Sequence, residues 1–470
     1  MTSLLIIFLG AILVLYYGIN RPEKKSIPLV LSLLIAALIF LAKDWIGVIS
    51  GNFPAWQAKY VPVSMLEWDP TAIAFSSVLV IALLMVIGLF SRNKHTGADL
   101  LGLMLFSISG GMLMTSFTNL IMLFLGIECL SIPLYVLAGS RKSDLSANES
   151  AIKYFLMGAF STAVFLLGCA FVYGGSGSLE LESISRALSM MNHINVKSNL
   201  IFAGILLLMA GMLFKVSAFP FHFWSPDVYD GSPNRTTVFM ATVAKIAAFA
   251  AFYRLFNIAL SEVKAWWGLT LAISAAITIL FGNISAIRQA SFKRLLAYSS
   301  VAHAGYMLMA ILASPGDGFW ALLVYVLAYA SSAVIVFYLL DRTAEGKSDF
   351  AFDNFNGFGN QNRWLSLLLV VSLFSMAGIP LTAGFAGKYG LFSSIVSSYP
   401  WLMIVALIGS AISISYYFRV FKNAFFSSEN GSVAWKMRTV EIVFLIVATI
   451  ITLLVGCWPG VINLLQQLPG

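Results

Sequence analysis

Charged residues are scarce in this chain of 470 residues. Asp, Glu, Lys and Arg together make up 10% of it, whereas hydrophobic residues make up 60%. Soluble domains carry about 25% charged residues, so the composition excludes a soluble globular enzyme and a disordered or fibrous chain. The apolar stretches are continuous and do not alternate with polar residues, which also excludes an outer-membrane β-barrel. These observations predict an all-α polytopic membrane protein.

Metal-binding and nucleotide-binding patterns are also missing. The three cysteines lie in apolar segments without metal-ligand spacing, so we interpret them as small buried hydrophobic residues. The sequence contains no Walker loop, no glycine-rich dinucleotide fingerprint after a strand, and no Cys/His set for iron–sulfur, haem or zinc. The net charge of +8 is spread over short loops, so we expect no nucleic-acid binding. By itself the chain is expected to hold no cofactor or metal and to catalyse no redox step.

Fourteen apolar runs are long enough to be candidate membrane spans. If the first runs from outside to inside, the odd-numbered loops hold eighteen Lys and Arg residues and the even-numbered loops hold six. The positive-inside rule predicts this bias. We therefore expect fourteen transmembrane helices, both termini on the periplasmic side of a bacterial inner membrane, and polar connections at 43–70, 174–198 and 341–363. The runs begin near Ser3, Ile27, Thr71, Leu100, Asn119, Ala151, Asn199, Thr236, Ala265, Leu295, Gly318, Trp364, Trp401 and Arg438.

A few ionisable residues lie inside these apolar runs. A charge at the bilayer centre costs about 2.5–3.5 kcal/mol, so such side chains are expected to face the bundle interior and water. A buried lysine can be neutral or charged, and a nearby glutamate favours its charged form. Such a pair can take up and release protons. The residues are Glu128, Lys153, Lys215, Lys245 and Lys388.

Each of these residues also has a purely structural interpretation. Lys153 is close to the start of its helix and can extend to the membrane surface. The other four can form buried structural ion pairs. His303 lies near mid-depth in the tenth run, where it can relay protons or act as an ordinary core histidine.

Two prolines predict broken helices. Pro220 follows Lys215 and Pro380 precedes Lys388. Proline frees a helical carbonyl, and broken helices at membrane depth line cavities. His222, next to the first break, can gate proton uptake or cap freed backbone. Prolines are also simply common in membrane helices.

The predicted breaks lie five runs apart, which predicts two inverted five-helix repeats covering spans 4–8 and 9–13. We therefore divide the chain into four parts. These are an N-terminal three-helix segment (1–98), a first antiporter-like repeat (99–260), a second antiporter-like repeat (261–425) and a C-terminal helix (426–470).

Several motifs resemble a known family. FKVSAFPFHFWSPDVYDGSPNRTTVFMATVAKIAAFA at 214–250, GIECLSIPLYVLAG at 126–139, SFKRLLAYSSVAHAGY at 291–306 and AGIPLTAGFAGKYGLF at 377–392 resemble subunit N of proton-pumping NADH:quinone oxidoreductase, respiratory complex I. This family belongs to the antiporter-like membrane subunits. The resemblance implies a half-channel in each repeat, with Glu128 and Lys215 as a coupling pair and Lys153 close by. Lys245 would connect this pair to His303 and Lys388.

The same resemblance implies a non-redox, proton-translocating subunit of an enzyme complex. NAD, FMN, iron–sulfur clusters and quinone would bind partner subunits, with no direct NADH binding here. The partners would be other membrane-arm subunits, including antiporter-like paralogues, and lipids. The alternatives are a subunit of a multisubunit cation/proton antiporter and a membrane scaffold whose buried charges only stabilise packing.

Overall fold

The chain is built from helices. The computed structural model describes residues 1–20, 26–50, 65–91, 97–193, 198–344, 350–426, 435 and 437–457. Within these residues the elements are helices and three isolated β-bridges, without a strand. Twelve of the helical segments are long and apolar enough to cross a membrane. The prediction of an all-α polytopic membrane protein is therefore confirmed.

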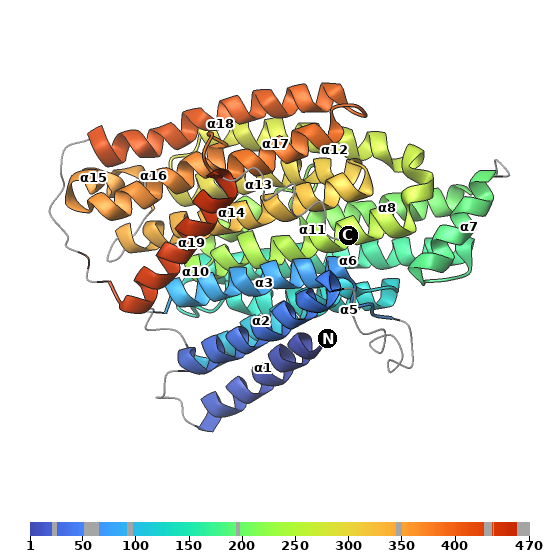
Figure 1. The fold of residues 1–470 in the computed structure, drawn as a ribbon, viewed down its shortest axis with the longest axis horizontal. Coiled ribbons are helices and arrows are strands. Elements are labelled where there is room, and N and C mark those ends of the chain that lie inside the picture. The colour runs from blue at the N-terminus through green and yellow to red at the C-terminus, as the bar shows by residue number, and fades with distance from the viewer. Residues whose placement is uncertain are drawn as a thin grey trace.

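The first three helices are α1 (Thr2–Asn20), α2 (Ile27–Ile49) and α3 (Pro70–Leu89). α1 and α2 lie along one margin of the bundle (Figure 1) and expose many apolar side chains, whereas α3 is buried. The start of α3 follows from its sequence. Asp69 caps the helix by accepting a hydrogen bond from the Ala72 amide at 2.7 Å, and Pro70 occupies the first turn, where no amide donor is needed.

The next part of the chain contains a helix that the sequence analysis missed. Its helices are α4 (Ala98–Ser116), α5 (Leu120–Ala138), α6 (Leu145–Ser176), α7 (Leu181–His193), α8 (Asn199–Lys215), α9 (Trp224–Gly231), α10 (Asn234–Phe239), η2 (Met240–Ala244), α11 (Lys245–Arg254) and η3 (Leu255–Ala259). The polar connection predicted at 174–198 contains α7. The buried residues Leu181, Ile184 and Leu188 have helical spacing, which was the signal for this amphipathic helix.

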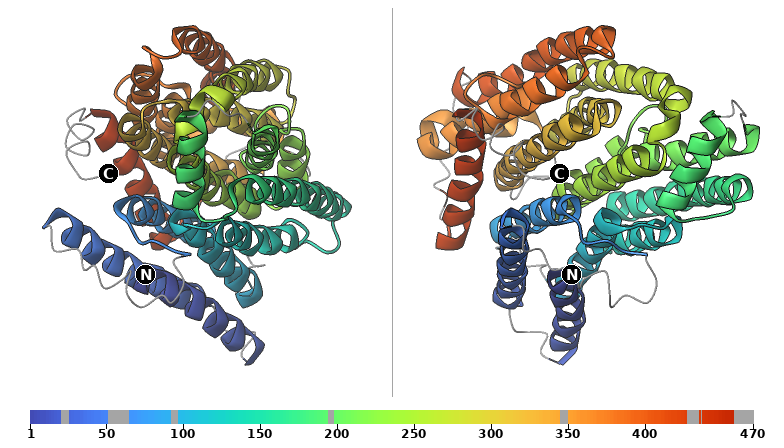
Figure 2. Two further views of the ribbon diagram at one scale, coloured as in Figure 1. Left: turned by 90° about the vertical axis from the view of Figure 1, so that its right-hand side faces the viewer. Right: turned by 45° about the vertical axis from the view of Figure 1, so that its right-hand side comes forward.

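Several of the remaining helices pack around α14. They are η4 (Ser261–Val263), α12 (Lys264–Ile287), α13 (Phe292–Leu312), α14 (Pro315–Thr343), η5 (Phe352–Phe355), α15 (Phe358–Gln361), α16 (Arg363–Ala377), α17 (Ala383–Ile395), α18 (Pro400–Phe426) and α19 (Thr439–Cys457). α14 packs against α3, α13, α16, α17 and α19 and is almost wholly buried. α18 lies on the margin opposite α1, and α19 crosses its neighbours steeply (Figure 2).

Two pairs of short helices interrupt the pattern of long ones. α8 and α9 are separated by residues 216–223, and α16 and α17 by residues 378–382. Pro220 and Pro380 lie in these two connectors. Ser217, Gly378 and Leu381 adopt positive φ angles of 60°, 85° and 71°, which turn the chain between the two halves of each pair.

Candidate functional site

Glu128 and Lys215 lie in the same part of the bundle without forming a direct ion pair. The Thr162 hydroxyl of α6 donates to the Glu128 carboxylate on α5 at 2.9 Å. The Lys215 ammonium, at the end of α8, donates to the Ser131 hydroxyl at 3.0 Å. Ser131 lies three residues after Glu128, so both project from one face of α5. Among the described residues no ion-pair contact joins Glu128 to Lys215.

The connector after Lys215 is held by α12. The Phe219 amide donates to the Thr278 hydroxyl at 2.9 Å, and the Ser274 hydroxyl donates to the Phe219 carbonyl at 2.8 Å. The His222 ring packs against the Phe281 ring, with 4.4 Å between ring centroids. Its Nδ1 atom is buried and has no hydrogen-bond partner among the described residues. The first break thus contacts the second predicted repeat directly.

Lys245 links α11 to α13. It follows the π-helical turn η2 and is only 3% exposed. Its ammonium donates to the Ser300 carbonyl at 2.6 Å and to the Ser300 hydroxyl at 2.5 Å, and lies 5.8 Å from the centre of the Tyr329 ring. π-Helical turns are frequent at functional sites. Here the turn immediately precedes a buried cation with neutral oxygen acceptors.

His303 lies one helical turn after Ser300 on α13. Its Nδ1 atom hydrogen-bonds the Tyr325 hydroxyl of α14 at 2.7 Å, and its Nε2 atom the Tyr417 hydroxyl of α18 at 3.2 Å. The imidazole is 4% exposed. Because both ring nitrogens contact hydroxyls, which donate or accept, either neutral tautomer fits this environment.

Lys388 lies beyond His303, beside the second break. Its ammonium donates to the Ala377 carbonyl at 2.7 Å and to the Ser410 hydroxyl of α18 at 2.9 Å. It is 3% exposed and lies 4.9 Å from the centre of the Tyr306 ring. Ser300, His303 and Tyr306 follow at three-residue intervals and rise about 9 Å along α13. Ser300 contacts Lys245, and Tyr306 lies beside Lys388.

Lys153 belongs to a different cluster. It is 41% exposed and pairs with Glu149 at 2.7 Å and with Asp227 of α9 at 3.5 Å. The other carboxylate oxygen of Asp227 contacts Arg294 at 2.9 Å. No described hydrogen bond or ion pair joins Lys153 to Glu128 or Lys215, so its closeness to that pair stays a prediction.

Sequence reasoning also missed two buried cations, which it assigned to loops. Arg254 is 3% exposed in the last turn of α11, and Lys293 is 2% exposed in the first turn of α13. Lys293 donates to the Asp230 and Ser232 carbonyls at the end of α9. The apolar residues on both sides of Arg254 were the available signal, whereas Tyr325 and Tyr417 gave none because tyrosine is common in membrane helices.

Among the described residues no group of three or more His, Cys, Asp or Glu could hold a metal ion.

The sequence matches a known family over most of its length. A family model described as "NADH:quinone oxidoreductase/Mrp antiporter, TM" matches residues 117–413, which include every residue of the predicted site. NADH-quinone oxidoreductase subunit N of Cytophaga hutchinsonii is 39% identical over 423 residues, covering 89% of this chain and 91% of the relative. NADH-quinone oxidoreductase subunit N 1 of Chloroherpeton thalassium is 42% identical over 318 residues, covering 67% and 66%.

Solved structures share the fold. A chain of respiratory complex I from Thermus thermophilus with bound aureothin superposes with a TM-score of 0.83 at 30% identity and covers 100% of both chains. A chain of the Mrp complex from Dietzia sp. DQ12-45-1b gives a TM-score of 0.78 at 16% identity, covering 99% of this chain and 96% of that one, which establishes a shared fold alone. This chain therefore belongs to the NADH:quinone oxidoreductase/Mrp antiporter family of membrane subunits, and within it to the subunit N group.

Proposed function

We propose that this protein translocates protons as a membrane-arm subunit of an NADH:quinone oxidoreductase. The observation that supports this most directly is the row of buried polar groups on α13, which runs between Lys245 on α11 and Lys388 on α17. Buried ionisable groups in membrane proteins mark proton relays. A structural scaffold does not need cations aligned in this way.

The chemistry of the row suits proton exchange. Among the described residues no carboxylate is in ion-pair contact with Lys245 or Lys388. Burial penalises the charged form of an amine more than the neutral form, and no described carboxylate pairs with these two amines to offset that penalty. Hydroxyls and the His303 imidazole both donate and accept, so they can pass a proton between the two amines with bridging water.

Glu128 and Lys215 form the coupling pair of the first unit in this proposal. Both contact hydroxyls, Glu128 that of Thr162 and Lys215 that of Ser131, and the Lys215 side chain reaches α5 from the end of α8. A small movement of α8 against α5 would bring them into an ion pair or separate them, changing the affinity of Lys215 for its proton. Pro220 and Pro380 supply the breaks at which such movements occur, and His222 stands at the first of them.

Fourteen spans in two inverted repeats fit this function. The twelve long helices supply twelve spans, and the broken pairs α8–α9 and α16–α17 would be the seventh and twelfth. The repeats would then be residues 99–260 and 261–425, flanked by 1–98 and 426–470. Each would contain one broken helix beside a lysine, Lys215 in the first and Lys388 in the second.

The rest of the complex would supply the redox chemistry. NADH, flavin, iron–sulfur clusters and quinone would bind partner subunits, and this chain would contact other membrane-arm subunits, including antiporter-like paralogues. It would lie in the bacterial inner membrane with both termini on the periplasmic side. The relatives named NADH-quinone oxidoreductase subunit N support the assignment to this complex.

The test uses the intact complex purified from native membranes and reconstituted into vesicles. Glu128→Gln and Lys215→Ala should leave subunit composition unchanged and abolish proton uptake driven by NADH, whereas Lys422→Ala, which removes an exposed lysine of α18, should pump normally. Normal pumping and quinone reduction in all three would contradict the proposal. Co-purification without flavin or iron–sulfur subunits, together with cation/proton exchange, would favour the antiporter, whose family shares the matching model.

A further inference from the structure

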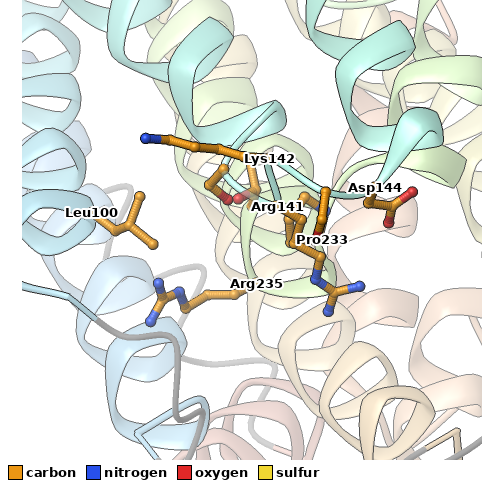
Figure 3. A pocket seen from close by; sticks show the side chains of 9 residues that line it. Leu100, Arg141, Lys142, Asp144, Pro233 and Arg235 are labelled. Carbon is orange, nitrogen blue, oxygen red and sulfur yellow. The ribbon is translucent and has the colours of Figure 1, made fainter.

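A polar cavity lies at one end of the bundle, apart from the row of buried polar groups on α13. Its volume is about 470 Å³, and it lies where α5 ends and where α6 and α10 begin (Figure 3). Ligand pockets typically measure about 300–1,000 Å³. It is lined by Leu100, Ser140, Arg141, Lys142, Ser143, Asp144, Pro233, Arg235 and Thr236.

The lining carries more positive than negative charge. Three basic residues, Arg141, Lys142 and Arg235, line the cavity with one acid, Asp144, whose carboxylate accepts a hydrogen bond from the Ser146 amide at 3.0 Å and so caps α6. In Figure 3 the Lys142 and Arg235 side chains extend in the same direction on either side of Leu100, and Asp144 lies on the opposite side.

Arg235 gives the cavity a fixed cation. It is 7% exposed in the first turn of α10. Asp341 and Asp99 interact with it electrostatically, but neither lines the cavity. Ser140 and Ser143 also line the cavity and carry hydroxyl donors. Guanidinium, ammonium and hydroxyl donors around one space are the groups that bind phosphate oxygens.

An apolar stripe leads from the cavity along the outside of α5. Leu125, Ile132 and Val136 are 44%, 55% and 55% exposed, and Val136 lies four residues before Ser140. Side chains spaced in this way lie on one helix face. Their exposure favours a ligand with a hydrophobic portion over a free anion.

We propose that this cavity binds a phosphate group, and that the phosphate is the headgroup of a phospholipid whose acyl chains lie along the exposed stripe of α5. The basic residues hold the headgroup and the stripe holds the chains. This site is independent of the row of buried polar groups on α13, because none of the residues that line the cavity belongs to that row.

Photocrosslinking of the assembled complex tests the proposal. The complex is reconstituted into vesicles of dioleoylphosphatidylcholine and dioleoylphosphatidylglycerol that contain a phosphatidylglycerol with a diazirine on one acyl chain. After illumination, lipid adducts on residues 120–145 are quantified by peptide mass spectrometry. Arg141→Gln/Lys142→Gln should lower them at least about tenfold, which corresponds to about 1.4 kcal/mol. Both residues are exposed, so the fold should tolerate the change.

Matched controls separate the alternatives. Arg288→Gln/Lys422→Gln also removes two exposed basic residues and should leave the adducts unchanged. Equal labelling of wild type and Arg141→Gln/Lys142→Gln, or equal labelling by a diazirine diacylglycerol without phosphate, would overturn the proposal. A further experiment adds inorganic phosphate to the assembled complex in detergent. If it slows hydrogen exchange of residues 139–144 while lipid adducts are absent, the cavity binds free phosphate and the assignment to lipid fails.

Discussion

The Lys388 ammonium donates to the carbonyl oxygen of Ala377, the last residue of α16, at 2.7 Å. The helix after the second break thus caps the helix before it. The Ser410 hydroxyl accepts from Lys388 and also lies 3.2 Å from the same carbonyl, to which it can donate. Because the ammonium replaces a helical hydrogen bond that the break removed, the protonation state of Lys388 and the geometry of the break are linked.

Lys388→Arg separates charge from proton exchange. Arginine can still cap α16, but it keeps its proton at all working pH values. We expect normal assembly and a loss of proton translocation of at least about tenfold, measured as proton uptake by vesicles together with the rate of quinone reduction. The control is Lys422→Arg on the exposed face of α18. Proton pumping at the wild-type rate would show that Lys388 does not need to release its proton.

Ser300→Ala should weaken the link between α11 and α13 without breaking it. The hydroxyl bond to Lys245 is lost, but the Ser300 carbonyl remains as an acceptor. A hydrogen bond to a charged group contributes about 1.5–3 kcal/mol. Because about 1.4 kcal/mol corresponds to a factor of ten, proton translocation should fall by about tenfold or more and not vanish. Ser332→Ala, which removes another fully buried serine hydroxyl, should pump normally. An equal loss in both variants would indicate a general packing effect.

Gly384→Ala should force the halves of the second broken helix apart. A Cβ atom at Gly384 would lie 1.7 Å from the Ser375 carbonyl oxygen, which belongs to backbone and cannot rotate away. Overpacking costs about 1–3 kcal/mol or more, so the yield of assembled complex should drop. Gly390→Ala in the same helix meets nothing closer than 3.6 Å and should assemble normally. Equal yields would mean that α16 and α17 can separate freely.

Arg254→Gln should be strongly destabilising. The guanidinium donates to the Phe117 carbonyl at 2.7 Å and pairs with Asp69 at 2.6 Å and Glu67 at 3.3 Å. Breaking a buried ion pair costs about 3–5 kcal/mol, measurable as lower thermal stability of the assembled complex. Arg186→Gln removes an exposed arginine of α7 and should leave that stability unchanged. Equal stability of the two variants would contradict this role of Arg254.

The two acids beside Arg254, Glu67 and Asp69, should contribute differently to thermal stability at pH 7. Burial, followed by repulsion from Asp69, raises the pKa of Glu67. The stabilisation that Glu67 contributes is therefore fully present below its ordinary pKa and is lost as pH rises through the raised value. At pH 7, Glu67→Gln should leave thermal stability unchanged or slightly higher, whereas Asp69→Asn should lower it. As the pH falls, the wild type should gain thermal stability relative to Glu67→Gln. A large loss in Glu67→Gln at pH 7 would contradict this expectation.

Most helix positions were predictable because apolar length dominates in a membrane protein. Predicted and observed starts agree within a few residues for almost every run, for example Ile27 and Asn199. The exception is α6, which begins at Leu145 and not near Ala151. Its first turn is polar and is capped by Asp144, so hydropathy alone placed the start too late.

The candidate site was only partly predictable. Burial of Lys245, Lys388 and His303 follows from their apolar surroundings, and all three are buried. Their connections through Ser300, Tyr325 and Tyr417 depend on which helices become neighbours, which no local pattern encodes. The pairing of Lys153 with Asp227 likewise depends on the turn that the first break makes.

The contact between Arg254 and the start of α3 has a consequence for biogenesis. Asp69 enters the bilayer region early in synthesis, but its cation is 185 residues further along the chain. Until α11 has been inserted, the carboxylates at the start of α3 have no counter-ion from this arginine. The start of α3 is therefore expected to reach its final depth late, after the translocon has released more than half of the polypeptide.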